Sequence, residues 1–408
     1  MNKRMNRSRL NIGAYHLRPY ARTEQHIKEL AECGIDFIAC MENDRAALDL
    51  FEKYGIGAML NDVVPGWWGG DGSSAGQLEA TNPMEKYEEA AAKFVDHPAI
   101  WAIDIGDEPS ALDFPYYGKV FSKVNQCFPN QFPYLNLYPN YASVSQNSEN
   151  QTVSQLGTAT YEEHIAAYCQ NVPSDYICYD FYPYSINVDR HYQNLRVVAD
   201  AARNTGRSMW IVLQVNSNKP EEWISENRLR FQAYSAMAFG AENIIWACYT
   251  AGWWHNQVLD EKGNKTEQYE KLKKINAEIH AIAEEYMRYR RTETYFVGFG
   301  EDFGSRVYNC KSLDALNTGV FYGVNADSPL IVGEMVSREK DGSVALMICA
   351  AGDPYDRAPT KVTVRFGVEK GRTLQAFVGK EKMPLTKEAD GSYSVEISSC
   401  SGLFITAK

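Results

Sequence analysis

The sequence predicts an α/β fold, a (β/α)8 TIM barrel followed by an antiparallel β-sandwich domain, and three observations support it. Over residues 1–292, short apolar runs alternate with amphipathic helical patterns, each pair filling roughly 30–40 residues. Eight such runs can be counted, which is the number that a closed barrel of this kind requires. Over residues 293–408 the pattern changes to short alternating strands between Gly-, Asp- and Lys-rich turns, as in a β-sandwich. We therefore expect two domains, with the boundary between residues 292 and 293.

Each predicted barrel strand is an apolar run of the length that a buried parallel strand needs. In chain order these runs are 10–15, 36–40, 57–61, 100–105, 134–138, 176–181, 209–214 and 244–249. The loop after the first run carries no GxGxxG motif, so an open doubly wound sheet that binds a dinucleotide is not favoured.

Helical patterns lie between these runs, and several of them end at a glycine, which supplies the left-handed residue that terminates a helix. Clear examples are 25–34, 82–95, 161–172 and 226–240, and a last helix is expected at about 267–290. The strands predicted for the β-sandwich are 343–351, 361–368, 374–379, 393–397 and 402–407.

Composition argues against two classes of partner. The 408 residues include 41 Lys and Arg against 52 Asp and Glu, a formal net charge of −11, which argues against a nucleic-acid-binding protein. No run approaches the roughly 18 apolar residues of a membrane span, so we expect no membrane partner. The one skew is aromatic, with 26 Tyr, 17 Phe and 8 Trp, and it suits a surface that handles carbohydrate.

The cysteine and histidine patterns predict neither a metal nor another cofactor. The nine cysteines form no CxxC pair, and the seven histidines form no HExxH motif. The glycines of the GGDG segment at 69–72 precede no GK[ST] phosphate-binding sequence. Free cysteines in apolar strands indicate a reducing compartment, and the basic start lacks the apolar stretch of a signal peptide. We therefore expect a cytoplasmic protein, and a leader lost from the sequence would indicate secretion instead.

The active site of such a barrel lies at the carboxyl ends of its strands, so the residues at each strand end are the candidates for binding. Acids, amides and aromatic side chains dominate these positions, as the hydroxyl groups and apolar faces of a sugar would require. The substrate-binding candidates are Tyr15, His16, Asn61, Trp67, Trp68, Asn136, Asn140, Tyr141, Tyr182, Gln214, Tyr249, Trp253 and Trp254.

The sharpest signal is the Asp107-Glu108-Pro109 step at the end of the fourth strand. Two adjacent carboxylates repel one another and raise one another's pKa, which is what a general acid requires. Glycoside hydrolysis needs such a protonated acid and a second group that stabilises the oxocarbenium-like transition state. In the structural alternative, Asp107 caps the following turn and Glu108 pairs with a Lys or Arg.

Several segments give the chain a resemblance to a clan of barrel glycoside hydrolases. They are IGAYHLRPYARTEQHIKELAECGIDFI, IDIGDEPS, LNLYPNYAS, YICYDFYPY, WIVLQVN and FGAENIIWACYTAGWW. In that clan an Asn-Glu-Pro or Asp-Glu-Pro step ends strand four, an Asp-x-Tyr-Pro step ends strand six, and a β-sandwich follows the barrel. The resemblance covers nearly the whole chain and implies that Glu108 is the general acid/base of a hydrolase that acts on carbohydrate.

One position departs from the clan and leaves the mechanism open. The retaining members place a nucleophilic Glu at the end of strand seven, where this chain has Gln214. In one alternative, as in the substrate-assisted β-N-acetylhexosaminidases, Asp107 orients a 2-acetamido group of the substrate, which attacks in place of an enzyme nucleophile. In a second, Asp180 supplies the missing carboxylate, although it could instead orient a neighbouring Tyr or Arg.

In a third alternative, the barrel binds carbohydrate without hydrolysing it, and Gln214 marks the lost nucleophile. The retained Asp107-Glu108 pair argues against that loss. A lyase or isomerase would need a metal cluster or a Lys base at a strand end, and the sequence suggests neither. The sandwich is expected to bind carbohydrate, to brace the barrel or to form the interface of a homo-oligomer.

Overall fold

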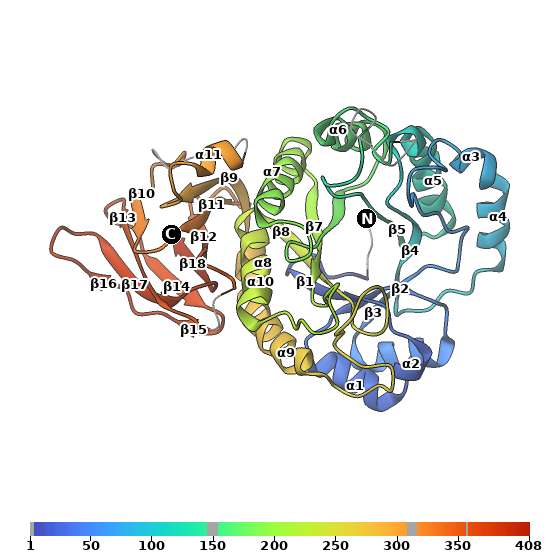
Figure 1. Ribbon diagram of the computed structural model, residues 1–408, viewed down its shortest axis with the longest axis horizontal. Helices are drawn as coiled ribbons and strands as arrows, with labels where there is room; N and C mark the ends of the chain where they lie inside the picture. The colour runs from blue at the N-terminus through green and yellow to red at the C-terminus, as the bar shows by residue number, and fades with distance from the viewer. Residues whose placement is uncertain (1–3, 145–153, 308–315, 356–357) are drawn as a thin grey trace.

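The computed structural model describes residues 4–144, 154–307, 316–355 and 358–408, and it confirms the predicted fold class. The barrel and a smaller β-sandwich lie side by side, and the barrel helices form the outer ring around its strands (Figure 1). In the described part of the chain, no helix is both long and apolar enough to cross a bilayer.

Eight parallel strands form the barrel sheet, in the order β5-β4-β3-β2-β1-β8-β7-β6. Between β5 and β6 the sheet is closed by a single parallel bridge, Leu137 to Tyr179. The strands are β1 Asn11–Tyr15, β2 Phe37–Met41, β3 Gly57–Leu60, β4 Ile100–Asp107, β5 Phe132–Asn136, β6 Tyr176–Phe181, β7 Ser208–Gln214 and β8 Ala241–Ala247.

The outer helices begin and end at residues that the sequence marks. Thr160 and Glu163 form a reciprocal capping box at the start of α6, and Gly206 ends α7 at φ 70°. The helices are α1 Glu24–Glu32, α2 Arg45–Tyr54, α3 Leu78–Thr81, α4 Met84–Lys93, α5 Phe114–Cys127, α6 Tyr161–Asn171, α7 Val188–Thr205, α8 Glu226–Ala238, α9 Glu267–His280 and α10 Ala283–Met287, with short 3-10 turns at Pro19–Ala21 and Ala111–Asp113.

The inside of the barrel is a packed aromatic core. Tyr176 stacks on Trp210 with ring centroids 4.3 Å apart, and Phe132 contacts the edge of the same indole. These rings fill the interior below the carboxyl ends of the strands, together with Tyr134 and Cys178. The packed core is consistent with a binding site at the barrel mouth, because in such barrels the interior is filled and is not a pore.

The β-sandwich packs on the barrel through α8. Gly333 of β11 lies so close to this helix that an added Cβ would sit 2.1 Å from the Ala238 carbonyl oxygen, and an added Cβ on Gly402 would meet the Tyr234 ring. The four-stranded sheet has the order β10-β13-β17-β16, and the six-stranded sheet has the order β15-β14-β18-β12-β11-β9. Its elements are β9 Tyr289–Val297, α11 Phe303–Arg306, β10 Phe321–Ala326, β11 Leu330–Ser337, β12 Val344–Ala350, β13 Lys361–Val368, β14 Leu374–Val378, β15 Glu381–Lys382, β16 Thr386–Lys387, β17 Tyr393–Ser398 and β18 Gly402–Ala407.

Several expected elements differ from the observed ones in their bounds. The strands expected at 134–138 and 244–249 begin two and three residues earlier, at Phe132 and Ala241, and the helix expected at 267–290 divides into α9 and α10. The first strand of the sandwich, β9, begins at Tyr289, so the predicted domain boundary falls within that strand.

Candidate active site

A cavity of about 390 Å³ opens at the carboxyl ends of the barrel strands, and its size is that of an ordinary small-molecule site. Eleven of its twelve lining residues were candidates from the sequence. The twelve are Tyr15, His16, Trp68, Asp107, Glu108, Asn136, Tyr141, Asp180, Tyr182, Val212, Trp253 and Trp254. Strands far apart in the sequence therefore bring their terminal residues to one site.

Asp107, the last residue of β4, and Glu108, the residue that follows it, both line this cavity. In an extended strand, neighbouring side chains point to opposite faces. Here Gly106 has φ 153°, and Glu108 has the left-handed φ of 48°, which ends the extended conformation. The turn brings Glu108 to the same side as Asp107. A non-glycine residue in this conformation is strained, and such strain is characteristic of functional sites.

The loop after β3 holds this strained turn in place. The Asp107 N–H donates to the Trp67 carbonyl at 2.8 Å, and the Gly69 N–H donates to the Asp107 carbonyl at 3.0 Å. An added Cβ at Gly69 would lie 1.6 Å from the Glu108 carbonyl oxygen, so only glycine fits there. The backbone therefore fixes Glu108 without using its carboxyl group.

Trp68, in the same loop, is the hydrogen-bond donor to the Glu108 carboxyl group. Its indole Nε1 lies 3.1 Å from Glu108 Oε2, while its ring is 66% exposed. An exposed indole at the edge of a cavity can stack against the apolar face of a sugar ring. Trp68 therefore presents an exposed aromatic ring at the cavity and, through its N–H, contacts the carboxyl group of Glu108.

Asn136, at the end of β5, bridges the other two carboxyl groups. Its Nδ2 donates to Asp107 Oδ1 at 3.1 Å and to Asp180 Oδ1 at 3.0 Å. Its Oδ1 accepts the thiol hydrogen of Cys178 at 3.4 Å, which fixes the orientation of the amide. The three side chains from β4, β5 and β6 are therefore held as one unit.

The cavity raises the pKa of all three carboxyl groups. Burial is the main cause for Glu108, and the charges of Asp180 and Asp107 raise its pKa further, well above the ordinary value. Burial likewise raises the pKa of Asp107 and of Asp180, and the amide of Asn136 opposes this effect at both.

No lysine or arginine is among the lining residues that the structure describes. Two arginines that follow β1 in the sequence have partners outside the lining: Arg18 donates to the Ala251 carbonyl at 2.7 Å, and Arg22 pairs with Glu42. Burial lowers the pKa of His16 to about 4, so this imidazole is neutral at pH 7. Without a cation in the lining, nothing offsets the rise in the pKa of these carboxyl groups except neutral hydrogen-bond donors. Within the described residues, no three His, Cys, Asp or Glu side chains are grouped to hold a metal ion.

Aromatic side chains form the walls of the cavity. The rings of Tyr15, His16 and Trp253 meet edge to face, with centroids 5.7 to 5.8 Å apart. On the neighbouring wall, Tyr182 meets Trp254 at 5.1 Å. His16 and Trp254 also have left-handed backbones, at φ 63° and 64°. Flat apolar walls above polar groups are suited to a pyranose ring.

Gln214, the residue at the nucleophile position, does not line the cavity. It is 1% exposed, and its amide groups are used by the loops around it. Its Oε1 accepts from the Tyr184 N–H at 3.1 Å, and its Nε2 donates to Ser185 Oγ at 2.9 Å and to the Asn216 carbonyl at 3.0 Å. Gln214 therefore ties two loops together, and β7 contributes Val212 to the cavity.

Four other predicted binding residues also lie outside the cavity lining. Tyr249 is fully buried, and Trp67 packs against the main core. The amide of Asn61 contacts Cys40 Sγ at 3.0 Å, and that of Asn140 donates to the Arg190 carbonyl at 3.1 Å. Local contacts at the strand ends hold these side chains.

Val212 is the one lining residue that the sequence did not indicate as a candidate. It lies within β7 and belongs to the barrel-interior cluster together with Trp210. The alternation of side chains along β7 could have indicated it, because Val212 is two residues from Trp210 and so points to the same face of the strand.

The sequence matches no protein-family model and no curated relative. Among solved structures, the chain is similar to a glycoside hydrolase family 5 mannosidase from Rhizomucor miehei, at 12% identity and a TM-score of 0.42, over 66% of this chain and 92% of that one. It is also similar to a glucosidase from Croceicoccus marinus, at 9% identity and a TM-score of 0.46, over 100% and 97%. A β-glucuronidase from Ruminococcus gnavus gives 11% identity and a TM-score of 0.47, over 67% and 52%. At this level the similarity concerns the fold and identifies no activity for this chain.

Proposed function

We propose that this protein is a glycoside hydrolase that uses Glu108 as its general acid/base. The observation that carries the proposal is the gathering of three carboxyl groups, without a cation, in an aromatic cavity of about 390 Å³. Burial and the neighbouring carboxyl groups raise the pKa of Glu108, which favours its protonated form. Glu108 gives this proton to the leaving oxygen. In a retaining or substrate-assisted reaction, its carboxylate then accepts a proton from the attacking water, whereas in an inverting reaction the second carboxylate accepts that proton.

Asp180 is our first candidate for the second carboxylate. Asp180 lines the same cavity as Glu108, and its charge contributes to the raised pKa of Glu108. Asp180 would act as the nucleophile of a retaining reaction or as the base of an inverting one. In the alternative, Asp107 orients a 2-acetamido group of the substrate, and no enzyme nucleophile is needed.

The charge of the cavity limits the class of sugar. A sugar carboxylate would lie beside three acidic groups with no arginine or lysine among the lining residues. Like charges in a partly buried site repel strongly. We therefore expect neutral hexosides or N-acetylhexosaminides as substrates and little activity on uronides.

The substitution Glu108→Gln tests the proposal. We expect kcat on glycosides with poor leaving groups to fall by about 10²–10⁴, because no proton reaches the leaving oxygen. Aryl glycosides with acidic phenols should lose much less, since they need little protonation. Circular dichroism should show an unchanged fold. Turnover like that of the wild type on poor leaving groups would refute the assignment of Glu108.

The variants Asp180→Asn and Asp107→Asn distinguish the two mechanisms. If Asp180 is the second carboxylate, Asp180→Asn should abolish hydrolysis of aryl hexosides and aryl N-acetylhexosaminides alike. If the acetamido group attacks, activity should be confined to N-acetylhexosaminides and should depend more on Asp107. The anomeric configuration of the first product, followed by NMR, separates retention from inversion.

A carbohydrate-binding barrel without activity is the alternative that Gln214 raised, and the site does not favour it. Three grouped carboxyl groups at raised pKa, one of them on a strained turn, are more typical of a catalytic site than of a site that only binds. Binding of oligosaccharides without any product would support this alternative.

A further inference from the structure

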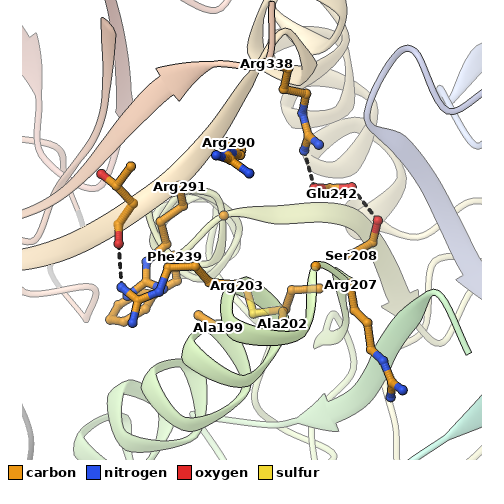
Figure 2. Close-up of a pocket in the computed structure, with 14 residues that line it drawn as sticks. Ala199, Ala202, Arg203, Arg207, Ser208, Phe239, Glu242, Arg290, Arg291 and Arg338 are labelled. Atoms are coloured by element: carbon orange, nitrogen blue, oxygen red, sulfur yellow. Dashed lines mark hydrogen bonds and ion pairs between the residues drawn. The ribbon is translucent and has the colours of Figure 1, made fainter. Parts of the chain in front are cut away.

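A second cavity, of about 370 Å³, lies between the barrel and the β-sandwich (Figure 2). We call it the seam cavity. Its barrel side includes Ser208 at the start of β7 and Glu242 at the start of β8, and its sandwich side includes Arg290 of β9 and Arg338 after β11. Both barrel strands begin there, so the seam cavity lies at the opposite end of the barrel from the candidate active site.

Arginines dominate the lining of the seam cavity. Among the lining residues that the structure describes there are five arginines and one carboxylate, in a chain with a formal net charge of −11. The arginines are Arg203, Arg207, Arg290, Arg291 and Arg338, and the carboxylate is Glu242. A concave surface with this excess of one charge attracts ions of the opposite sign.

The carboxylates around the seam cavity are already paired. Arg338 Nη2 lies 2.5 Å from one oxygen of Glu242, and the Ser208 hydroxyl donates to the other oxygen at 2.5 Å. Arg291 and Arg203 share one oxygen of Asp200, at 3.0 and 3.6 Å. These two carboxylates therefore neutralise other guanidinium groups and not that of Arg290.

Arg290 has no counterion within the described structure. Its side chain is exposed, and no described residue gives it a hydrogen bond or an ion pair. Figure 2 places it between Arg338 and Arg291, and no dashed line reaches it. Because no described carboxylate pairs with it, Arg290 keeps its N–H donors available to an anion that enters the cavity.

We propose that the seam cavity binds a compact oxyanion, the phosphate, sulfate or carboxylate group of a small molecule, with Arg290 as its main ligand. A guanidinium group presents two parallel N–H donors that match such a group in a bidentate way. Arg338, which already pairs with Glu242, is drawn near Arg290 in Figure 2, whereas Arg207 points away from them. Because the lining comes from both domains, the ligand would contact the barrel and the sandwich and stabilise their contact.

Thermal unfolding of the whole chain tests this proposal. The probes are inorganic phosphate, sulfate and citrate, each compared with sodium chloride at the same ionic strength. A ligand that binds only the folded state raises Tm with its concentration. We expect at least one oxyanion to raise Tm by a few degrees in a saturable way, and the most effective probe indicates the group that is bound.

The variant Arg290→Gln separates the site from general salt effects, because sulfate and phosphate also stabilise proteins without binding a site. The variant should lose the saturable rise, while Arg365→Gln, which removes an exposed arginine of β13, should keep it. An equal rise in the wild type and in Arg290→Gln, or no saturable rise with any probe, would overturn the proposal. The proposed hydrolase activity should be unchanged in Arg290→Gln, so the two proposals fail independently.

Discussion

Buried carboxyl groups have different partners near the seam between the two domains and at the mouth of the barrel. Near the seam, Glu293 is 2% exposed and is bound by Arg196 and by Arg291, with Nη2 of the latter at 3.2 Å. At the mouth, Asp180 is 4% exposed, and its side-chain hydrogen-bond partners are the neutral groups of Asn136 and Tyr182. The comparison teaches that the partner decides the role: a paired carboxylate joins elements of the fold, and a carboxyl group without a cation keeps its proton and is suited to chemistry.

The largest expected effect on stability concerns the buried ion pair of Arg196 and Glu293 near the seam. Arg196→Met should lower the free energy of unfolding by about 3–5 kcal/mol, because it removes one partner of a buried ion pair. Arg196 and Glu293 have side chains only 5% and 3% exposed. Urea unfolding measures the loss.

The matched control is Arg306→Met, which breaks an exposed pair with Asp189 and should cost no more than about 1 kcal/mol. An equal loss of stability in the two variants would show that burial does not make the Arg196–Glu293 pair more important than the exposed pair.

At the mouth, we expect Asp180→Asn to stabilise the protein at high pH. The pKa of Asp180 is raised in the folded state, so the folded state binds this proton more tightly than the unfolded chain does. The contribution to stability is complete below the unfolded pKa of about 3.9 and is lost as the pH rises through the folded pKa. At pH 8 the variant should exceed the wild type by about 1.4 kcal/mol or more, since each pKa unit corresponds to about that free energy.

Urea unfolding at pH 5 and pH 8 measures this effect. The wild type should lose more stability between the two values than Asp180→Asn does, whereas the exposed substitution Asp390→Asn should not reproduce this difference. Identical pH dependence in the wild type and Asp180→Asn would contradict the raised pKa.

The smallest expected effect concerns Trp68. Its indole N–H stabilises the charged form of Glu108, so Trp68→Phe should raise the pKa of Glu108 further. The alkaline limb of the kcat/KM profile should then move upward by roughly half a pH unit to one. Trp67→Phe is the matched control, because Trp67 is its neighbour but does not line the cavity. A shift of equal size in both variants would show that the hydrogen bond is not the cause.

The fold could be predicted from the sequence to a large extent, because the periodicity of apolar residues is local information. The strand predicted at 176–181 agrees with β6, and the five strands predicted for the sandwich agree with β12, β13, β14, β17 and β18 to within a residue at each end. Strand β9, at the edge of the six-stranded sheet, was not predicted, because it follows α10 directly and its first residues lie in the region expected to be helical.

The site was predictable where strand ends alone decide which residues meet. Asp107, Asn136 and Asp180 end neighbouring strands, and the closed barrel brings them together. Gln214 occupies an equivalent position, but contacts with the 184–185 loop cover it, and such contacts between loops leave no pattern in the sequence. The left-handed turn at Glu108 was equally hidden, since it depends on the close approach of Gly69.

The central claim is that Glu108 carries a proton at neutral pH while it faces the cavity. The infrared spectrum of the wild type minus that of Glu108→Gln, recorded at pH 7, measures the protonation state of this side chain. We expect the carbonyl stretch of a protonated carboxyl group, which Glu108→Gln lacks. A carboxylate band at pH 7 in place of the protonated band would contradict the claim.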